Sequence, residues 1–208
     1  MKRIAVLALG LALVAPSAAS VTAQSNTMTF FITSTGPGKG GDLGGLAGAD
    51  AHCSALAKAA GAPATRVWRA YLSTDTVNAK DRIGAGPWVN AKGVTVATSV
   101  ADLHSDANKL SKDNSLTEKG AVVNGRGDKP NQHDILSGSN LDGTSSGKSC
   151  NNWTSSGADA TATVGHHDRQ GGGANPTSWH SAHDSKGCGL DALRGSGGEG
   201  YFYCFAAK

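Results

Sequence analysis

The chain has 208 residues, with 29 glycines but only four Trp, three Tyr and four Phe, so much of it must be loop around a small core. Its formal net charge is +3 at pH 7 and its basic residues are scattered, which favours neither a nucleic acid nor an acidic membrane surface as partner. The length suits one domain that can bury a core.

The N-terminus has the three zones of a secretory signal peptide. Positive charge at Lys2 and Arg3 is followed by an apolar run from Ile4 to Val14 and by small residues up to Ala23. The apolar run is too short for a membrane span, and no later segment approaches the roughly 20 apolar residues that a spanning helix needs. We therefore expect a signal peptide over residues 1–23, a secreted (periplasmic or extracellular) protein without a membrane span, and a single domain over 24–208 with its core at about 28–206.

Three elements are predicted in the first part of the mature chain. The β-branched and aromatic residues of Met28–Thr35 predict an opening strand. The Ala-rich segment Gly48–Ala60 predicts a helix that turns Cys53 inward and ends before Gly61. The alternating pattern of Val67–Ser73 then predicts a second strand.

The remaining predicted elements are shorter and more widely spaced. Thr74 and Asp75 are expected to cap a short helix reaching Ile83. The polar segment over residues 102–147 predicts sparse regular structure. Further strands or extended core segments are predicted at Trp88–Val89 and Val94–Val100, with a closing strand at Tyr201–Phe205.

The four cysteines predict two disulfides. Their spacing contains no Cys-x-x-Cys pair of the kind that binds zinc, and oxidation is usual in an exported protein. Four cysteines can pair in three ways. A helix bearing Cys53 and a closing strand bearing Cys204 favour a bridge between them, which would leave Cys150 and Cys188 to close an inner loop.

Five short motifs carry a resemblance to a known fold. They are Gly44–Cys53, Trp68–Ser73, His133–Leu136, Cys150–Ser155 and Phe202–Phe205. Together they resemble the C-type-lectin-like fold, and more narrowly bacterial exported lectin-like proteins of its endostatin type, over nearly the whole mature chain. The resemblance implies an α+β fold with short helices packed on small antiparallel sheets, a long loop region and two nested disulfides, Cys53 with Cys204 and Cys150 with Cys188.

The function that the resemblance implies is non-catalytic carbohydrate binding through the loop region between Cys150 and Cys188, with a glycan or glycoconjugate as partner. Calcium-dependent members use a Glu-Pro-Asn or Gln-Pro-Asp triplet and a Trp-Asn-Asp triplet, where this chain has Ala174-Asn175-Pro176 and Trp179-His180-Ser181. The family's calcium triplets are therefore missing. Trp179 is the expected stacking platform for a sugar ring, while Trp153 is expected to pack onto a disulfide. The residues expected to supply hydrogen bonds are Asn151, Asn152, Asp168, Arg169 and His180.

Two alternatives remain open at this point. A divalent metal, calcium or zinc, is the one cofactor that the residues suggest, because His166, His180, His183 and Asp184 offer imidazole and carboxylate ligands. Such a cluster would serve a metal-dependent hydrolase. The third reading is a structural module that binds a protein partner at the cell surface, for which exposed loops are equally suited.

Overall fold

A computed structural model describes residues 27–207, so the expected signal peptide over 1–23 lies outside the described residues. The described chain is a mixed α+β structure with short helices, small sheets and two disulfides. Its elements are β1 (Phe30–Ile32), α2 (Gly45–Ala59), β2 (Trp68–Ala70), the 3₁₀ turn η1 (Ala79–Asp81), β3 (Trp88–Val89), β4 (Thr95–Ala97), α3 (Val100–Leu103), β5 (Asp134–Leu136), α4 (Cys150–Trp153), β6 (Thr163–His166), β7 (His183–Asp184), α5 (Leu190–Arg194) and β8 (Gly198–Ala206).

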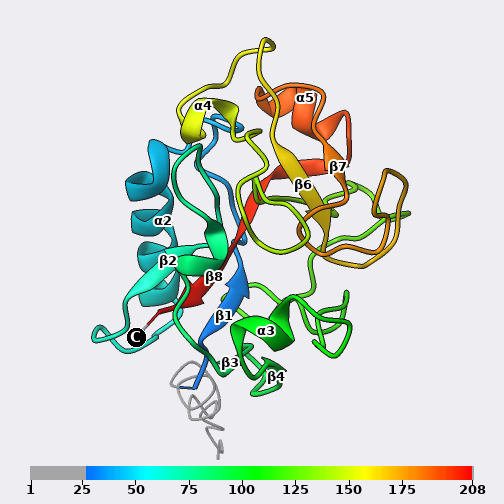
Figure 1. Cartoon of the computed structure of the whole chain (residues 1–208). Helices are drawn as coiled ribbons and strands as arrows, with labels where there is room; N and C mark the ends of the chain where they lie inside the picture. The colour runs from blue at the N-terminus through cyan, green and yellow to red at the C-terminus, as the bar shows by residue number, and fades with distance from the viewer. Residues whose placement is uncertain (1–26, 208) are drawn as a thin grey trace, which may run out of the picture.

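The last strand, β8, organises the sheet. β1 and β2 both pair antiparallel with its C-terminal half, whereas β5 pairs parallel with its N-terminal half. β6 then pairs with β5, and β7 with β6, both antiparallel, while β3 and β4 form a separate two-stranded sheet. Figure 1 shows β8 in red crossing the molecule, with α2 on one side and β6 and β7 on the other. The predicted closing strand is confirmed and extends beyond its predicted bounds at both ends.

The core lies on both faces of β8. Phe202 and Cys204 point into one apolar cluster, and the alternating residues Tyr201, Tyr203 and Phe205 point into a second. All five residues are at most 9 % exposed. A strand that is buried on both faces has a nearly continuous apolar sequence, and this pattern predicted the closing strand.

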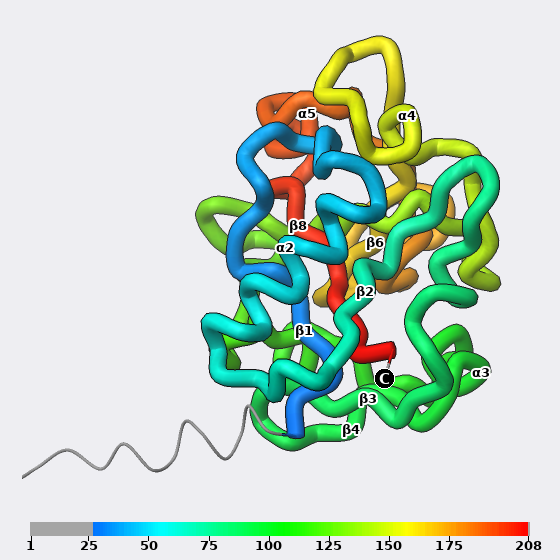
Figure 2. The backbone as a smooth tube through the Cα atoms, turned by 90° about the vertical axis from the view of Figure 1, so that its left-hand side faces the viewer, coloured from blue at the N-terminus to red at the C-terminus, as the bar shows by residue number. Residues whose placement is uncertain are grey.

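Helix α2 covers the first of these faces. Its buried residues Ala49, Cys53 and Ala57 are four apart, so they form one stripe along the helix. Their small side chains let the helix approach β2 closely, and Figure 2 shows α2 lying across β8 and β1. The predicted helix is confirmed, although it begins at Gly45 and ends at Ala59.

The two disulfides are nested, as the resemblance implied. Cys53 is joined to Cys204 across 151 residues, and Cys150 is joined to Cys188 across 38. All four cysteines are fully buried. The outer bridge therefore fastens α2 to β8, and the inner bridge fastens α4 to the loop that precedes α5.

The short helix predicted after Thr74 is wrong: only the three-residue turn η1 forms there. The preceding residues instead close a tight turn, in which the Thr74 N–H donates to the Val77 carbonyl. The Ser73 hydroxyl accepts from the Ala79 N–H, which holds this turn against η1. A side chain that satisfies the backbone in this way competes with helix formation.

Candidate metal centre

Four polar side chains gather where β5, β6 and β7 lie side by side. Asp134 opens β5 and is paired directly with His166, the last residue of β6. His183 is the first residue of β7 and is paired with Val164 of β6. Val164 lies two residues before His166, so the side chains of His183 and His166 lie on the same face of the sheet. His133 immediately precedes β5. The strand register thus brings together residues from three separate segments of the chain.

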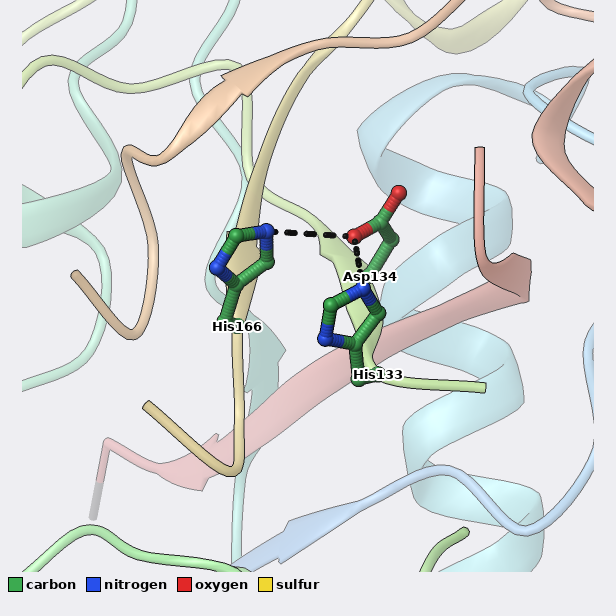
Figure 3. Close-up of side chains that lie close together, drawn as sticks. All are labelled: His133, Asp134 and His166. Carbon is green, nitrogen blue, oxygen red and sulfur yellow. Dashed lines mark ion pairs between the residues drawn. The ribbon is translucent and has the colours of Figure 1, made fainter. Parts of the chain in front are cut away.

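The carboxylate of Asp134 is the centre of this group. Its Oδ1 lies 3.2 Å from His133 Nε2 and 3.4 Å from the Nε2 atoms of both His166 and His183. His133, Asp134 and His166 are buried and offer ligand atoms that all lie within 4.8 Å of one another. In Figure 3 the carboxylate points between these two rings. The His183 side chain is 24 % exposed and borders the group on its open side.

The other ring nitrogens of His166 and His183 both face backbone carbonyls. His166 Nδ1 lies 2.8 Å from the Pro176 oxygen, and His183 Nδ1 lies 2.9 Å from the Asp184 oxygen. A carbonyl oxygen only accepts, so each Nδ1 carries the proton and donates it. When these rings are neutral, each Nε2 therefore directs a lone pair at Asp134.

His133 is oriented in the same way by a carboxylate. Its Nδ1 lies 3.4 Å from Asp168 Oδ1, so the proton sits on Nδ1 and Nε2 again faces Asp134. Burial works to raise the pKa of Asp168, but hydrogen bonds from His133 and from the Arg126 and Gln170 N–H groups hold it well below the usual value. Asp168 is therefore ionised and can orient the ring, as carboxylates behind metal-bound histidines do.

When all three rings are neutral, their Nε2 lone pairs thus converge on a buried carboxylate with no proton between them. Within residues 27–207, neither Asp134 oxygen nor His166 Nε2 has a hydrogen-bond partner. Burial favours the neutral acid and raises the pKa of Asp134, which falls below its ordinary value when His166 and His183 donate hydrogen bonds to the carboxylate. The hydrogen bond to Asp134 in turn raises the pKa of His183, whose ring is the more exposed one. A positive charge between these groups, either a proton on one of the rings or a bound cation, would satisfy them.

The spacing of the ligand atoms suits a small tetrahedral ion. Two ligand atoms about 2.0–2.1 Å from a tetrahedral zinc lie roughly 3.3–3.4 Å apart. The three separations around Asp134 Oδ1 are 3.2, 3.4 and 3.4 Å. Because imidazole and carboxylate are ordinary zinc ligands, both the chemistry and the size of the group fit zinc.

Two glycines allow the rings to come this close to the backbone. A Cβ on Gly171 would lie 2.2 Å from His166 Cε1, and a Cβ on Gly197 would lie 2.9 Å from His133 Cδ2. Gly197 also has a φ of +112°, which L-residues rarely adopt. The glycine-rich segments of the sequence are therefore part of how the ligand rings are packed.

The group opens into a cavity of about 390 Å³. Its three histidines, His133, His166 and His183, all line this cavity. The rest of the lining is polar or glycine: Arg126, Asn131, Gly171, Gly172, Gly173, Asp184, Lys186, Gly195 and Ser196. An ion held by the cluster would be reached from this cavity.

The structure brings together two of the four ligands that the sequence suggested. His166 and His183 are in the cluster, but Asp184 points to Lys148 and Thr163. His180 lies elsewhere, with its Nε2 3.1 Å from the Leu141 carbonyl. Neither side chain faces Asp134, so His180 and Asp184 are not part of the cluster.

Sequence reasoning missed His133 and Asp134 as ligands. They stand next to each other before the apolar pair Ile135-Leu136, a weak strand signal in a segment for which the sequence predicted only sparse regular structure. Their partner His166 is 32 positions further along the chain than Asp134, and only the antiparallel register of β5 and β6 brings the two together.

The residues expected to bind a sugar are dispersed. Trp179 is 2 % exposed and its indole N–H donates to the Leu103 carbonyl, so it offers no open face for stacking. With His180 and Arg169 it lines a second cavity of about 440 Å³. Asp168 instead supports His133 in the first cavity.

Asn151 and Asn152 lie in neither cavity. They belong to α4, in which Cys150 to Trp153 all have positive φ, from 48° to 66°, so that this element is a single left-handed turn. Left-handed helical geometry costs roughly 1–2 kcal/mol per residue, so its surroundings must impose it. The inner disulfide does so at one end, and at the other Trp153 is fully buried and donates its indole N–H to the Ser73 carbonyl at 2.7 Å. The expected core position of Trp153 is confirmed.

Burial of His180 predicts a pH-dependent stability. Burial, and to a smaller extent the nearby His104 ring, lower the pKa of His180 to about 3 in the native state. In the unfolded chain the same imidazole takes up a proton near its ordinary pKa of about 6.5. Between these values the unfolded state binds more protons, so the free energy of unfolding falls as the pH falls, by up to about 1.4 kcal/mol per pH unit. Urea unfolding of the wild type and of His180→Gln across this range should show a smaller slope for the variant. Equal slopes would mean that His180 is protonated in the native state.

Comparison of the chain with protein-family models and with curated proteins found no match. Among the described residues, no helix has both the length and the apolar character needed to cross a bilayer. Function must therefore be inferred from the geometry of the chain itself.

Proposed function

We propose that this chain is an exported C-type-lectin-like domain that binds a zinc-class divalent ion through His133, Asp134 and His166 and presents it to a ligand in the adjoining cavity. One observation carries the proposal. Imidazole nitrogens whose protons lie on the far side of the ring converge on a buried carboxylate, and both Asp134 oxygens and His166 Nε2 have no hydrogen bonds among residues 27–207. A cation at their common focus would satisfy all of them.

Zinc suits this donor set better than calcium. Calcium takes six to eight oxygen ligands, whereas the cluster offers one carboxylate and several imidazoles. With three protein ligands, a zinc ion keeps a fourth position for water or a ligand. His183 borders the cluster, with its Nε2 3.4 Å from Asp134 Oδ1, but it lies outside the three residues whose ligand atoms are all within 4.8 Å of one another.

Features of the fold support the lectin-like part of the proposal. The outer disulfide joins α2 to β8 and the inner one encloses a loop-rich segment, which is the nested arrangement that the resemblance implies. The inner disulfide closes the segment that carries His166 and His183. The proposed ligand surface is accordingly the loop region that the sequence suggested, extended by His133 and Asp134.

Zinc titration of the oxidised mature chain tests the proposal. After stripping with chelator, isothermal calorimetry should find one zinc per chain, and His166→Gln should weaken binding by about a hundredfold or more because it removes a ligand. His52→Gln is the matched control, since His52 lies on α2 and contacts the Thr35 carbonyl. A stripped protein that binds no zinc, or a His166→Gln variant that binds it normally, would refute the metal centre.

A second candidate function is metal-independent carbohydrate binding in the 440 Å³ cavity. The observation that favours it is that Trp179, His180 and Arg169, expected as sugar-binding residues, all line this one cavity. Arg169 is already engaged, however: its guanidinium donates to the Leu110 and Thr177 carbonyls. A ligand here would therefore bind to the cavity rim rather than to Arg169.

A further inference from the structure

We propose that the ligand presented to the metal ion carries an oxyanion group, a carboxylate or a phosphate, which the ion binds together with Arg126 and Lys186. This inference rests on the proposed metal centre and specifies the chemistry of its ligand. Both basic side chains line the 390 Å³ cavity into which the ligand histidines open.

The basic groups at this cavity are available to a ligand. Within residues 27–207, the Arg126 guanidinium has neither an ion pair nor a hydrogen bond. Lys186 Nζ donates one hydrogen bond, to the Gly195 carbonyl at 2.9 Å, which leaves two of its three N–H groups. The acidic residue of the outer lining, Asp184, is already paired with Lys148.

The charge of the occupied site also favours an anion. The ligand histidines would be neutral, and a divalent ion would be balanced by the carboxylates of Asp134 and of Asp168 behind His133. The metal centre would then be close to neutral. Arg126 and Lys186 would leave the cavity positively charged, and a cavity of one charge concentrates ligands of the other.

Asp168 links the basic side of the cavity to the metal centre. Its Oδ1 faces His133 Nδ1 at 3.4 Å, while its Oδ2 accepts from the Arg126 backbone N–H at 2.6 Å. The backbone at Gly125 lies close to this carboxylate: a Cβ at that position would be 2.6 Å from Asp168 Oδ2. One carboxylate therefore positions both a metal ligand and the backbone of the arginine. An oxyanion bound between the metal ion and Arg126 would coordinate the ion on one side. On the other side it would accept a charge-assisted hydrogen bond from the guanidinium.

The test measures binding of small anions to the zinc-loaded chain after free metal has been removed. The probes are acetate, glucuronate and inorganic phosphate, with glucose as the neutral sugar, and each is titrated into zinc-loaded and metal-free protein by calorimetry. At least one anion should bind about tenfold or more tightly than glucose and lose that advantage without zinc. Tighter binding of the carboxylates would indicate an acidic sugar or peptide, and tighter binding of phosphate a phosphorylated ligand.

Arg126→Gln and Lys186→Gln should each weaken anion binding by roughly tenfold while zinc affinity is unchanged. Lys92→Gln, at an exposed position outside the cavity, is the matched control. Zinc binding with no preference for anions, or with anion binding unaffected by both variants, would overturn this inference alone. A chain that binds no zinc would overturn the proposed function itself.

Discussion

Asp134→Asn should abolish zinc binding and yet stabilise the metal-free chain. The substitution removes a buried carboxylate that faces imidazole lone pairs without hydrogen bonds. The asparagine amide has nearly the same shape and brings two N–H donors, which can be given to the Nε2 atoms of His133 and His166. Satisfying buried acceptors in this way is worth about 1–3 kcal/mol. Loss of the one anionic ligand should lower zinc affinity by more than the roughly hundredfold typical of outer-shell changes.

The same variant separates a metal centre from a structural ion pair. If His133 or His166 were protonated and paired with Asp134, the substitution would leave a buried charge without its partner and cost roughly 3–5 kcal/mol. Urea unfolding of chelator-treated wild type and Asp134→Asn decides the sign. Asp191→Asn is the control, because the Asp191 side chain is fully exposed. A destabilised Asp134→Asn would contradict the metal centre even before zinc is added.

This opposite effect on stability and binding is characteristic of a functional site. Residues that serve a ligand are retained although a different side chain would make the free protein more stable. Asp50 shows the contrast within the same chain: its carboxylate accepts from the Arg82 guanidinium at 2.8 and 2.9 Å and from the Ala70 N–H at 2.9 Å. Asp50 is thus fully satisfied and joins α2 to β2. Asp134 has no such partners.

The scaffold could be predicted from the sequence because its signals are local. The run Tyr201–Phe205 is apolar on both faces because β8 is covered on both faces, and the alanine stripe of α2 follows directly from helical periodicity. Once this helix and strand were placed, Cys53 and Cys204 were natural partners. The disulfide topology then followed.

The candidate site could not be predicted in full because it depends on register. His180 is only three positions from His183 and was an equally good candidate ligand in the sequence. The pairing of β7 with β6 points His183 toward Asp134, whereas His180 precedes β7 and packs against Tyr71 and His104. Trp179 shows the same limit. The sequence suggested Trp179 as a stacking platform for a sugar ring, but its ring packs beside Tyr203 in the second core cluster.

The two disulfides should differ in what they support. In the chain-entropy estimate, the outer bridge, across 151 residues, contributes about 5 kcal/mol to stability, and the inner bridge, across 38 residues, about 4 kcal/mol. His166 and His183 lie inside the loop that the inner bridge closes, whereas the outer bridge joins α2 to β8 away from them. Replacing each pair of cysteines by alanine should therefore lower stability in both cases but weaken zinc binding only when Cys150 and Cys188 are removed.

Chemical unfolding and zinc calorimetry on the two double variants measure both quantities. A loss of about 5 kcal/mol is comparable with the whole stability of an ordinary domain, so the outer variant should be studied at low temperature with a stabilising osmolyte. Circular dichroism must first show that each variant is folded under those conditions. Equal zinc affinity in a folded Cys150→Ala/Cys188→Ala variant would mean that the pairing of β5, β6 and β7 holds the ligands without covalent help. Weaker binding in that variant alone would show that the inner disulfide, which also holds the left-handed turn at α4, keeps the ligand histidines in place.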